Sequence, residues 1–480
     1  MAEIKKINDF LWEIEKDKNS GMNVPIRLYA NEPLRNAIEK DRTLNQATNA
    51  SKLPSIVKNM LLMPDAHEGY SFPIGGVAAF DANDGIISPG AIGFDIGCGV
   101  RLIKTNLTEK ELRPKFGALM DAMFRNVPSG VGSKMHLGFT QKQLERIATE
   151  GVGYIVKEGY GFPEDPERTE EETHMKGADY GIVSDLAKKR GIQQLGTLGA
   201  GNHFAEVQKV DKIFDEKIGK AYGLEKDMVV IMLHSGSRGY GHQICSDYIR
   251  VLMDYQKKYN ITFPDVELSY AHVGSKEADR YWASMCSAIN FAFVNRQIMT
   301  HFIRKSFADT FKRSADELDM RLVYDLCHNT AKLEEHDVDG KRMSLYVHRK
   351  GATRAFGPGR KEIPSAYREY GQPVLIPGSM GTSSYVLAGR KEGMTETFGS
   401  SCHGAGRVMS RHQALREITS SKTLDEMKRK NIEIRVRSKK LVSEEAEWAY
   451  KNVDDVVASI EGAKISGIVA KLVPLGVTKG

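Results

Sequence analysis

Cysteines are few in this sequence, and they are too scattered for a disulfide framework. The 480-residue chain has five, none of them in a C-x-x-C pair: Cys98, Cys245, Cys286, Cys327 and Cys402. An odd number of dispersed cysteines argues against a disulfide-stabilised secreted domain. We therefore expect free thiols and a reducing, cytoplasmic compartment.

Long apolar runs are missing as well. Residues 1–9 lack the apolar core of a signal peptide, and no uncharged stretch approaches the roughly 20 residues that a membrane helix needs. These absences predict a protein without a secretory leader or a membrane span. No repeat of fixed period occurs, and we expect no clean linker between domains.

Two familiar nucleotide-binding signatures are absent. Residues 351–354, Gly-Ala-Thr-Arg, do not form a Walker motif, and the Lys-x-Asp-Gly motif of lysine-nucleotidylating ligases does not occur. Any nucleotide must therefore bind without a P-loop. A covalent nucleotide intermediate would need an acceptor other than the lysine of that motif.

The composition is that of a large, mildly basic protein. Hydrophobic residues make up 41% of the chain, and the formal net charge is +6. This charge suits a polyanionic partner without requiring one. Seven cationic residues lie in or beside Gly-rich segments, where they would either contact phosphates or form ordinary solvated surface charge: Arg238, Arg349, Lys350, Arg354, Arg360, Arg407 and Arg411.

The alternation of apolar runs and charged segments predicts the secondary structure. Short apolar runs punctuated by glycine from Met63 to Asn106 predict buried strands, whereas residues at about 107–190 predict a helix-rich charged insertion. Within that insertion, we expect the acidic run Glu164–Glu172 to be a solvated loop. Further strands are predicted at Val229–Leu233 and Leu322–Leu326, and helices at Ile244–Tyr259 and Ala278–Phe307.

Residues that can do chemistry are spread along nearly the whole chain, from Asp65 to Lys479. Distant segments must therefore converge, and we expect one interwoven catalytic domain over residues 1–480 instead of separable modules. The predicted fold class is α+β, with a β-rich core, Gly-rich loops at strand ends and peripheral helices.

One histidine, His403, stands among small residues in the segment Thr397–Arg407. Gly404 and Gly406 would let the backbone approach a ligand closely. A helix-like run begins at Val408, and a helix start there would offer unpaired N–H groups to an anion. The alternative interpretation is a glycine-rich turn with an incidental histidine.

A set of metal-ligand residue types follows strand-like or Gly-rich stretches. The set supplies one carboxylate, one thiolate and three imidazoles, all suited to a first-row divalent ion: Asp95, Cys98, His203, His234 and His328. Mixed cysteine and histidine ligands most often indicate structural zinc. Ligands so widely spread along the chain are, however, unusual for a structural site.

Together these segments resemble the RtcB family, the GTP-dependent tRNA-splicing RNA ligases, and particularly its archaeal members. The resemblance extends from Pro64–Tyr70 and Phe72–Ala78 through His348–Arg354 and Pro377–Thr382 to Gly476–Gly480. Members commonly read Pro-Asp-Gly-His-Gln-Gly at the first of these segments, whereas this chain has Ala66 and Glu68. These departures concern the handling of the RNA end more than catalysis.

The resemblance implies that the five ligands hold two Mn²⁺ ions, with the Cys98 thiolate bridging both. Such a pair of ions neutralises a phosphate under attack and orients nucleophile and leaving group. Asp65 and His67 are implied to lie behind the ligands or on the RNA side. Lys479, which position alone would make a frayed and solvated residue, is implied to belong to a guanylate pocket.

The resemblance further implies that His403 attacks the α-phosphate of GTP. Contacts to the nucleotide are implied for Asn202, His203, Phe204, Ala205, Glu206, His328, Asn329, Pro377, Gly378, Ser379, Met380, Ser384, His403, Gly404, Ala405, Gly406, Tyr450 and Lys479. Glu206 can accept hydrogen bonds from the guanine N1 and N2 donors, and Phe204 offers apolar contact.

The implied function is ligation of RNA 2′,3′-cyclic phosphate or 3′-phosphate ends to 5′-hydroxyl ends, as in tRNA splicing and RNA repair. A histidine-guanylate and an activated RNA 3′ end would be the intermediates, with cleaved RNA and GTP as partners and archease as a candidate activator. Two alternatives stay open: a metal-dependent cyclic phosphodiesterase that does not ligate, and a non-catalytic RNA-binding paralogue.

Overall fold

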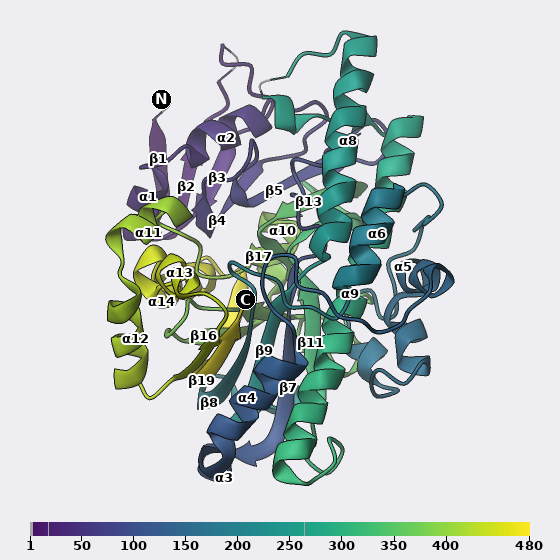
Figure 1. The fold of residues 1–480 in the computed structure, drawn as a ribbon. Coiled ribbons are helices and arrows are strands. Elements are labelled where there is room, and N and C mark those ends of the chain that lie inside the picture. The colour runs from purple at the N-terminus through teal and green to yellow at the C-terminus, as the bar shows by residue number, and fades with distance from the viewer. Residues whose placement is uncertain (1–2, 18, 264) are drawn as a thin grey trace.

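A computed structural model describes residues 3–17, 19–263 and 265–480, and it has the expected α+β class, with two large sheets and many helices (Figure 1). The N-terminal sheet has seven strands. In order across the sheet they are β1 (Ile4–Asn8), β2 (Leu11–Ile14), β3 (Ile26–Tyr29), β4 (Met60–His67), β5 (Ile74–Asp81), β13 (Lys341–Lys350) and β12 (Asn329–Val338).

The second large sheet has eight strands drawn from the middle and the C-terminal part of the chain. Its path is β11 (Leu322–Cys327), β7 (Gly99–Thr108), β9 (Met228–Ser235), β8 (Phe204–Ile213), β19 (Ser466–Lys479), β16 (Ser384–Gly389) and β15 (Pro373–Ile376), with β18 (Glu433–Val436) beside β19. Two short ladders join β6 (Ile86–Ile87) to β10 (Ala271–His272) and β14 (Ala352–Arg354) to β17 (Ser400–Cys402).

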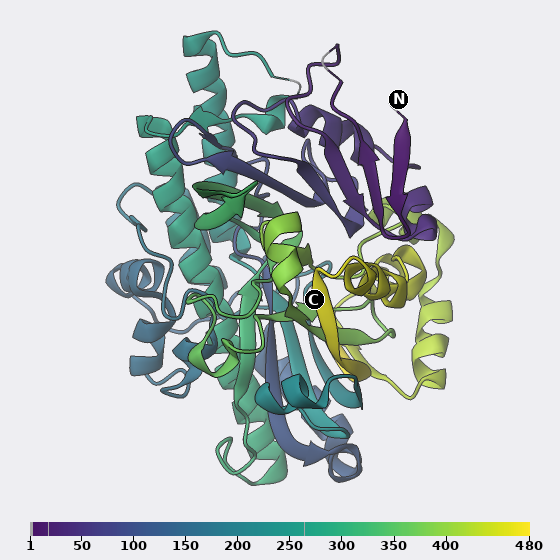
Figure 2. The ribbon, with the colours of Figure 1, turned by 180° about the vertical axis from the view of Figure 1, so that it is seen from behind.

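Two long helices run along one side of both sheets, as the front and back views show (Figures 1 and 2). They are α8 (Arg238–Tyr259) and α9 (Lys276–Phe311). Every residue of α9 from Ser284 to Thr300 is buried. A helix that is buried all round is part of the core. It is here covered by α4 (Phe116–Asn126), α5 (Gln141–Lys157) and α8.

The remaining helices are short and lie around this core. They are α1 (Glu32–Ile38), α2 (Thr43–Ala50), α3 (Glu109–Leu112), α6 (Asp185–Gln194), α7 (Glu216–Ala221), α10 (Lys391–Glu396), α11 (Arg411–Glu417), α12 (Ser420–Arg429), α13 (Lys439–Glu444) and α14 (Val453–Gly462). In the part of the chain that the structure describes, no helix is both long enough and apolar enough to cross a membrane.

The strands predicted at Val229–Leu233 and Leu322–Leu326 and the helices predicted at Ile244–Tyr259 and Ala278–Phe307 are present. β9 and β11 contain the two predicted apolar runs. Helix α8 begins before the predicted helix and ends with it, whereas α9 extends beyond the predicted helix at both ends. The strongly apolar or amphipathic periodicity of these segments made them predictable. All five cysteines are free and buried, as expected.

The acidic run Glu164–Glu172 is not the solvated loop that its composition suggested. Asp165 is fully buried and accepts two hydrogen bonds from the Arg304 guanidinium, at 2.6 and 2.8 Å. Glu170 is also buried and lies 3.1 Å from Lys332. The prediction was wrong because the basic partners lie far away in the sequence, and charge composition does not reveal buried pairing.

Candidate functional site

Four of the five predicted metal ligands stand at matching ends of neighbouring strands. Cys98 directly precedes β7 and His203 directly precedes β8, whereas His234 lies near the end of β9. The register pairs Phe204 with His234, and Gly99 with both Ser235 and Cys327. This pairing brings the ligand-bearing ends of the strands to one edge of the eight-stranded sheet. His328 lies there too, where the chain leaves β11 for β12 of the other large sheet.

The five ligands form two sets that share Cys98. In the first set, the Cys98 Sγ lies 3.3 Å from His203 Nε2, which lies 3.0 Å from Asp95 Oδ2. In the second, the same Sγ lies 3.3 Å from His234 Nε2, which lies 3.3 Å from His328 Nε2. Within each set the ligand atoms lie within 4.8 Å of one another. The predicted bridging position of Cys98 is thus geometrically available.

The hydrogen bonds of two histidines direct their Nε2 lone pairs toward Cys98. His203 Nδ1 lies 3.0 Å from the Leu198 carbonyl oxygen, and His234 Nδ1 lies 3.2 Å from that of Asn202. A ring that donates its Nδ1 proton to a carbonyl keeps Nε2 free to bind a metal. Each set therefore brings at least one nitrogen lone pair toward the Cys98 sulfur, and a cation suits this arrangement.

Burial has opposite effects on the two kinds of ligand. It lowers the pKa of His234 and of His328 well below the usual value, so both imidazoles are neutral. Burial, with the Asp95 carboxylate beside it, raises the pKa of the Cys98 thiol well above its usual value. A divalent ion would reverse the effect on the thiol, because its charge favours the thiolate. The donor types and their placement fit first-row divalent ions.

The polar triplet Asn295-Arg296-Gln297 of α9 is buried, and its Arg296 supports the ligand sets from behind. The Arg296 guanidinium donates to the carbonyl oxygens of Gly97 and Ser235, at 2.9 and 2.7 Å, and to the Asp325 carboxylate at 2.7 Å. Gly97 precedes Cys98 and Ser235 follows His234. One side chain thus fixes the backbone next to ligands from two strands. Sequence reasoning missed this triplet, because polar residues in a helix are usually on the surface.

His403 lies beside the second ligand set and is held by a buried carboxylate. Its Nδ1 is 2.5 Å from Asp65 Oδ2, and the same oxygen accepts the backbone N–H of His403 at 2.9 Å. The rings of His403 and His328 are 4.9 Å apart. Burial opposes ionisation of Asp65, but the neighbouring His403 and Lys451 outweigh it, and the pKa of Asp65 is lowered. An imidazole whose Nδ1 faces a carboxylate can keep its proton there and leave Nε2 as the free nitrogen.

The segment after His403 differs from the predicted helix. Residues 403–410 are not helical, and α11 begins only at Arg411, with Ser410 as its N-cap. A helix dipole therefore does not act on His403, because that field fades within the first turn. Gly406 is nevertheless required: its φ is +72°, and a Cβ there would lie 2.2 Å from the Asp65 carbonyl oxygen.

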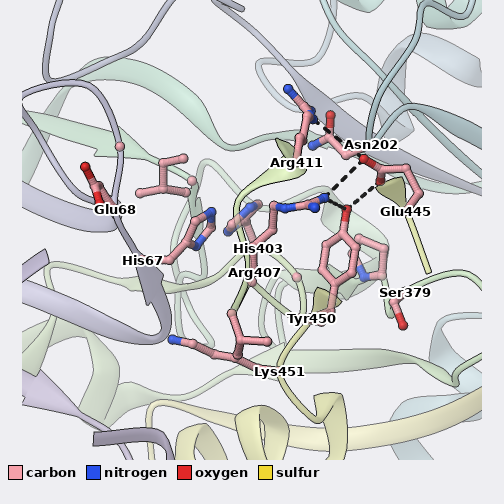
Figure 3. A pocket seen from close by; sticks show the side chains of 18 of the residues that line it. His67, Glu68, Asn202, Ser379, His403, Arg407, Arg411, Glu445, Tyr450 and Lys451 are labelled. Atoms are coloured by element: carbon pink, nitrogen blue, oxygen red, sulfur yellow. Dashed lines mark hydrogen bonds and ion pairs between the residues drawn. The ribbon is translucent and has the colours of Figure 1, made fainter. Parts of the chain in front are cut away.

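A cavity of about 1150 Å³ extends from the ligand sets past His403. In Figure 3, His67 and Glu68 lie on one side of His403, and Tyr450, Glu445 and Ser379 lie on the other. Most of the predicted nucleotide contacts line the cavity: Asn202, Phe204, Glu206, His328, Asn329, Pro377, Gly378, Ser379, Met380, His403, Gly404, Ala405, Gly406, Tyr450 and Lys479.

Three predicted contacts are not on the cavity wall: His203, Ala205 and Ser384. His203 belongs to the first ligand set, and Ala205 is fully buried in the sheet. Ser384 Oγ accepts hydrogen bonds from Gln208 Nε2 at 2.9 Å and from the Gly378 N–H at 3.1 Å. Ser384 therefore supports the cavity wall from behind.

Glu206 and Lys479 both line the cavity, and the charge of Lys479 acts on the Glu206 carboxyl group. Glu206 is buried, which raises its pKa to about 7 although a hydrogen bond from Gln208 and the charge of Lys479 lower it. Lys479 is only 3% exposed and pairs with Phe204 in the register of β19 and β8. The prediction from position alone, that Lys479 would be frayed and solvated, is therefore wrong.

The Lys479 ammonium belongs to a network that sequence reasoning had not predicted. Its Nζ donates to the Gly201 carbonyl at 2.9 Å and to the Glu445 carboxylate at 3.2 Å. Glu445 also accepts from the Tyr450 hydroxyl at 2.5 Å and from Arg407 at 3.2 Å (Figure 3). Glu445 gave no sequence signal, because it lies in an ordinary charged segment.

The seven cationic residues of the Gly-rich segments occupy three kinds of environment. Arg349, Arg354 and Arg360 form ion pairs with glutamates and do not line the cavity, so they support the fold instead of contacting phosphate there. Lys350, Arg407 and Arg411 line the cavity. The remaining one, Arg238, donates to the Thr197 hydroxyl at 3.2 Å and to the Gly130 carbonyl at 3.3 Å.

The two departures from the common motif are readily accommodated. Ala66 lies in β4, fully buried, and its carbonyl oxygen accepts a hydrogen bond from Lys451. An extended strand position does not need the conformational freedom of glycine. Glu68 is at the cavity edge, 3.8 Å from Arg42, in an ion pair whose side chains are largely exposed. Such a pair contributes little stability.

Comparison with known proteins gives consistent matches along the chain. The family model described as "tRNA-splicing ligase RtcB" matches residues 46–480. A tRNA-splicing ligase RtcB from Thermococcus kodakarensis is 52% identical over 481 residues, which cover 100% of this chain and 99% of that protein. Proteins of the same name from Archaeoglobus fulgidus and Pyrobaculum aerophilum are 51% and 49% identical, each over 99% of both chains.

Proposed function

The chain belongs to the RtcB family of tRNA-splicing ligases and is an RNA ligase, and on this premise we propose a GTP-dependent reaction that passes through a guanylate on His403. The observation that carries the proposal is the position of His403. Asp65 holds its Nδ1, and the ring lies beside the second ligand set in the cavity. A neutral imidazole held in this way is a competent nucleophile near pH 7.

We propose that the two ligand sets hold two Mn²⁺ ions, with Asp95, Cys98 and His203 around one and Cys98, His234 and His328 around the other. Bound ions would supply charge neutralisation at the phosphate oxygens. The nitrogen and sulfur ligands also suit zinc, which binds such sites more tightly than manganese. Cellular metal supply therefore contributes to which ion is bound.

In the first step, His403 Nε2 forms a bond to the α-phosphorus of GTP, the bond to the bridging oxygen breaks, and pyrophosphate leaves. Asp65 keeps the Nδ1 proton in place and stabilises the charge that develops on the ring. Glu206 accepts hydrogen bonds from the guanine N1 and N2 donors, and Phe204 contacts the base. Lys479 and Tyr450, joined through Glu445, close this end of the cavity.

In the later steps, an RNA 3′-phosphate oxygen takes the guanylate from His403, and an RNA 5′-hydroxyl then displaces GMP to form the 3′,5′-phosphodiester. A 2′,3′-cyclic phosphate would first be opened to the 3′-phosphate. We propose that residues 1–480 act as one catalytic domain in the cytoplasm, with cleaved tRNA or other broken RNA as substrate and archease as an activating partner. The cavity walls come from both large sheets, which supports a single domain.

Protein labelling tests the proposal. Incubation with Mn²⁺ and GTP labelled at the α-phosphate should give an acid-labile covalent guanylate, and peptide mass analysis should place it on His403. His403→Ala should abolish the label. His301→Ala, on α9 and packed against Tyr160, is the matched control and should keep it. Label on a lysine would overturn the mechanism. Opening of cyclic phosphates without any label would favour the phosphodiesterase alternative, and RNA binding with neither would favour the paralogue.

A further inference from the structure

A short loop at the mouth of the cavity, residues 68–71, is fixed by side chains from distant parts of the chain. The Glu68 N–H donates to Asp41 Oδ2 at 3.0 Å. The next residue, Gly69, donates to Gln46 Oε1 at 3.0 Å, and its carbonyl oxygen accepts from Gln46 Nε2 at 2.7 Å. The amide side chain of Gln46 thus both accepts a hydrogen bond from the Gly69 backbone and donates one to it.

The second half of the loop is held equally firmly. The buried Lys350 ammonium donates to the Tyr70 carbonyl oxygen at 2.7 Å and to that of Gly90 at 3.0 Å. Ser71 Oγ donates to Asp265 Oδ1 at 2.5 Å, and Ser71 has a φ of +53°, a conformation that non-glycine residues rarely adopt. The surroundings thus impose a strained backbone, which is common where a side chain must be presented for function.

The side chain at the centre of this rigid loop is nevertheless exposed. Tyr70 is 67% exposed, although it lines the cavity. Its ring meets Phe94 edge to face, with centroids 5.7 Å apart, and Phe94 in turn stacks on His242 at 5.0 Å. Phe94 directly precedes the ligand Asp95. An aromatic cluster therefore lies next to Asp95 of the first ligand set, and Glu68, two residues before Tyr70, lies across His403 from Tyr450 (Figure 3).

We propose that Tyr70 is a stacking platform for a nucleobase, the one at the 5′-hydroxyl end of the RNA strand to be joined. Unpaired bases are commonly bound by stacking on aromatic rings. A ring that the protein holds in place loses little entropy on binding. Tyr70 is two-thirds exposed and so accessible to such a base, and the edge-to-face contact with Phe94 supports its ring.

The choice of strand rests on the proposed function. Phosphoryl displacement places the attacking and the leaving oxygens on opposite sides of phosphorus. If GMP leaves toward Lys479, which Glu445 joins to Tyr450, the attacking 5′-hydroxyl approaches from the opposite side, where Glu68 and its loop lie across His403 from Tyr450 (Figure 3). The base of that terminal nucleotide then lies within reach of Tyr70.

Direct binding of oligonucleotides tests this assignment without catalysis. A 5′-hydroxyl RNA labelled at its 3′ end is titrated with the manganese-loaded full chain in the absence of GTP, and fluorescence anisotropy reports Kd. Tyr70→Ala should weaken binding about 5- to 100-fold, because stacking on an aromatic ring contributes that much per base. Tyr70→Phe should bind as the wild type does. Tyr259→Ala, which removes another exposed tyrosine at the end of α8, should have no effect.

The decisive measurement uses an RNA whose 5′-terminal nucleotide lacks its base. With the wild type it should cause the same loss as Tyr70→Ala, and the two changes together should cost no more than either alone. Additive losses would show that Tyr70 does not contact this base. The same test is made with a 3′-phosphate strand. If Tyr70→Ala weakened its binding, and this effect disappeared when the 3′-terminal base was removed, the assignment to the 5′ strand would be overturned.

Labelling of His403 is measured on the same protein samples. A parallel fall in labelling and in RNA binding in Tyr70→Ala would mean that the tyrosine only supports the fold of the site, and the platform would be wrong. Failure of the wild type to form a guanylate would sink the proposed function, whereas the binding arms would still report on stacking. The two failures are therefore distinguishable.

Discussion

At the scale of single residues, Cys98 is the ligand common to both sets, because each of them contains its sulfur. A serine hydroxyl is not ionised at neutral pH and cannot replace a bridging thiolate. We expect Cys98→Ser to weaken Mn²⁺ binding by more than about 100-fold, beyond the usual cost of losing a group behind a ligand, and to abolish ligation. Calorimetric metal titration and a ligation assay measure these two effects.

Cys286→Ser is the matched control for this prediction. Cys286 is also fully buried, but it lies on α9 outside both ligand sets. Its replacement places a hydroxyl in the core and should reduce stability without reducing metal affinity. Equal loss of metal affinity in both variants would mean that Cys98 is only a packing residue.

Glu206 predicts a pH dependence of GTP binding. Burial raises its pKa to about 7, and only the ionised carboxylate can accept hydrogen bonds from both the N1 and N2 donors of guanine. The affinity for GTP should therefore increase as pH rises through about 7, and at pH 6 it should be about tenfold weaker than at pH 8. Glu206→Gln should bind GTP weakly with little change over this range. A wild-type affinity independent of pH would contradict the role given to Glu206.

The effect of the same group on stability has the opposite sign. A carboxyl whose folded pKa is raised stabilises the fold in its protonated form. This contribution is present at low pH and is lost as pH rises through about 7. Conditions that improve guanine recognition therefore cost some stability of the unliganded protein.

At the scale of elements, the sequence predicted where helices and strands lie better than what they do. The apolar positions of α9 were evident from their spacing, and the helix is present. The burial and the role of Arg296 on this helix could not be predicted, because its partners Gly97, Ser235 and Asp325 come from other elements. The sequence singled out Asp65 but not its contact with His403, because the two residues are far apart in the chain.

Arg296 supplies a test of how α9 positions the ligands. Arg296→Lys keeps the charge but cannot reach both carbonyls and Asp325 at once. Breaking this buried pairing should destabilise the protein by about 3 to 5 kcal/mol and weaken Mn²⁺ binding about 10- to 100-fold. Urea unfolding of the metal-free protein and calorimetric metal titration measure the two effects separately.

Lys305→Ala is the control on the same helix. Lys305 forms an exposed ion pair with Asp309, so its removal should change stability by less than about 0.5 kcal/mol. If Arg296→Lys lost stability but bound Mn²⁺ normally, Arg296 would support the fold without positioning the ligands.

At the scale of the whole molecule, the α+β class and the convergence of distant segments could be predicted, but the sheet order could not. Strand pairing such as that of β7 with both β9 and β11 depends on long-range packing that no local pattern specifies. Local composition was misleading for the same reason at Asp165 and Glu170, which looked solvated and are buried. The cysteine and histidine residues near strand ends were informative about the site, because metal ligation requires these residue types whatever the order of the strands in the sheet.

The dependence of both ligand sets on α9 has a consequence for the order in which the molecule folds. The ligands come from strands that are distant along the chain, and Arg296 must reach the backbone beside two of them. Contacts between distant segments form slowly, because long loops must close first. If the ligand sets hold Mn²⁺ as proposed, the ions bind a chain that has already folded, and they do not serve as its folding nucleus. Added manganese should then slow unfolding while leaving the rate of folding unchanged, and a shortage of the ion should leave folded, metal-free protein that can still bind it.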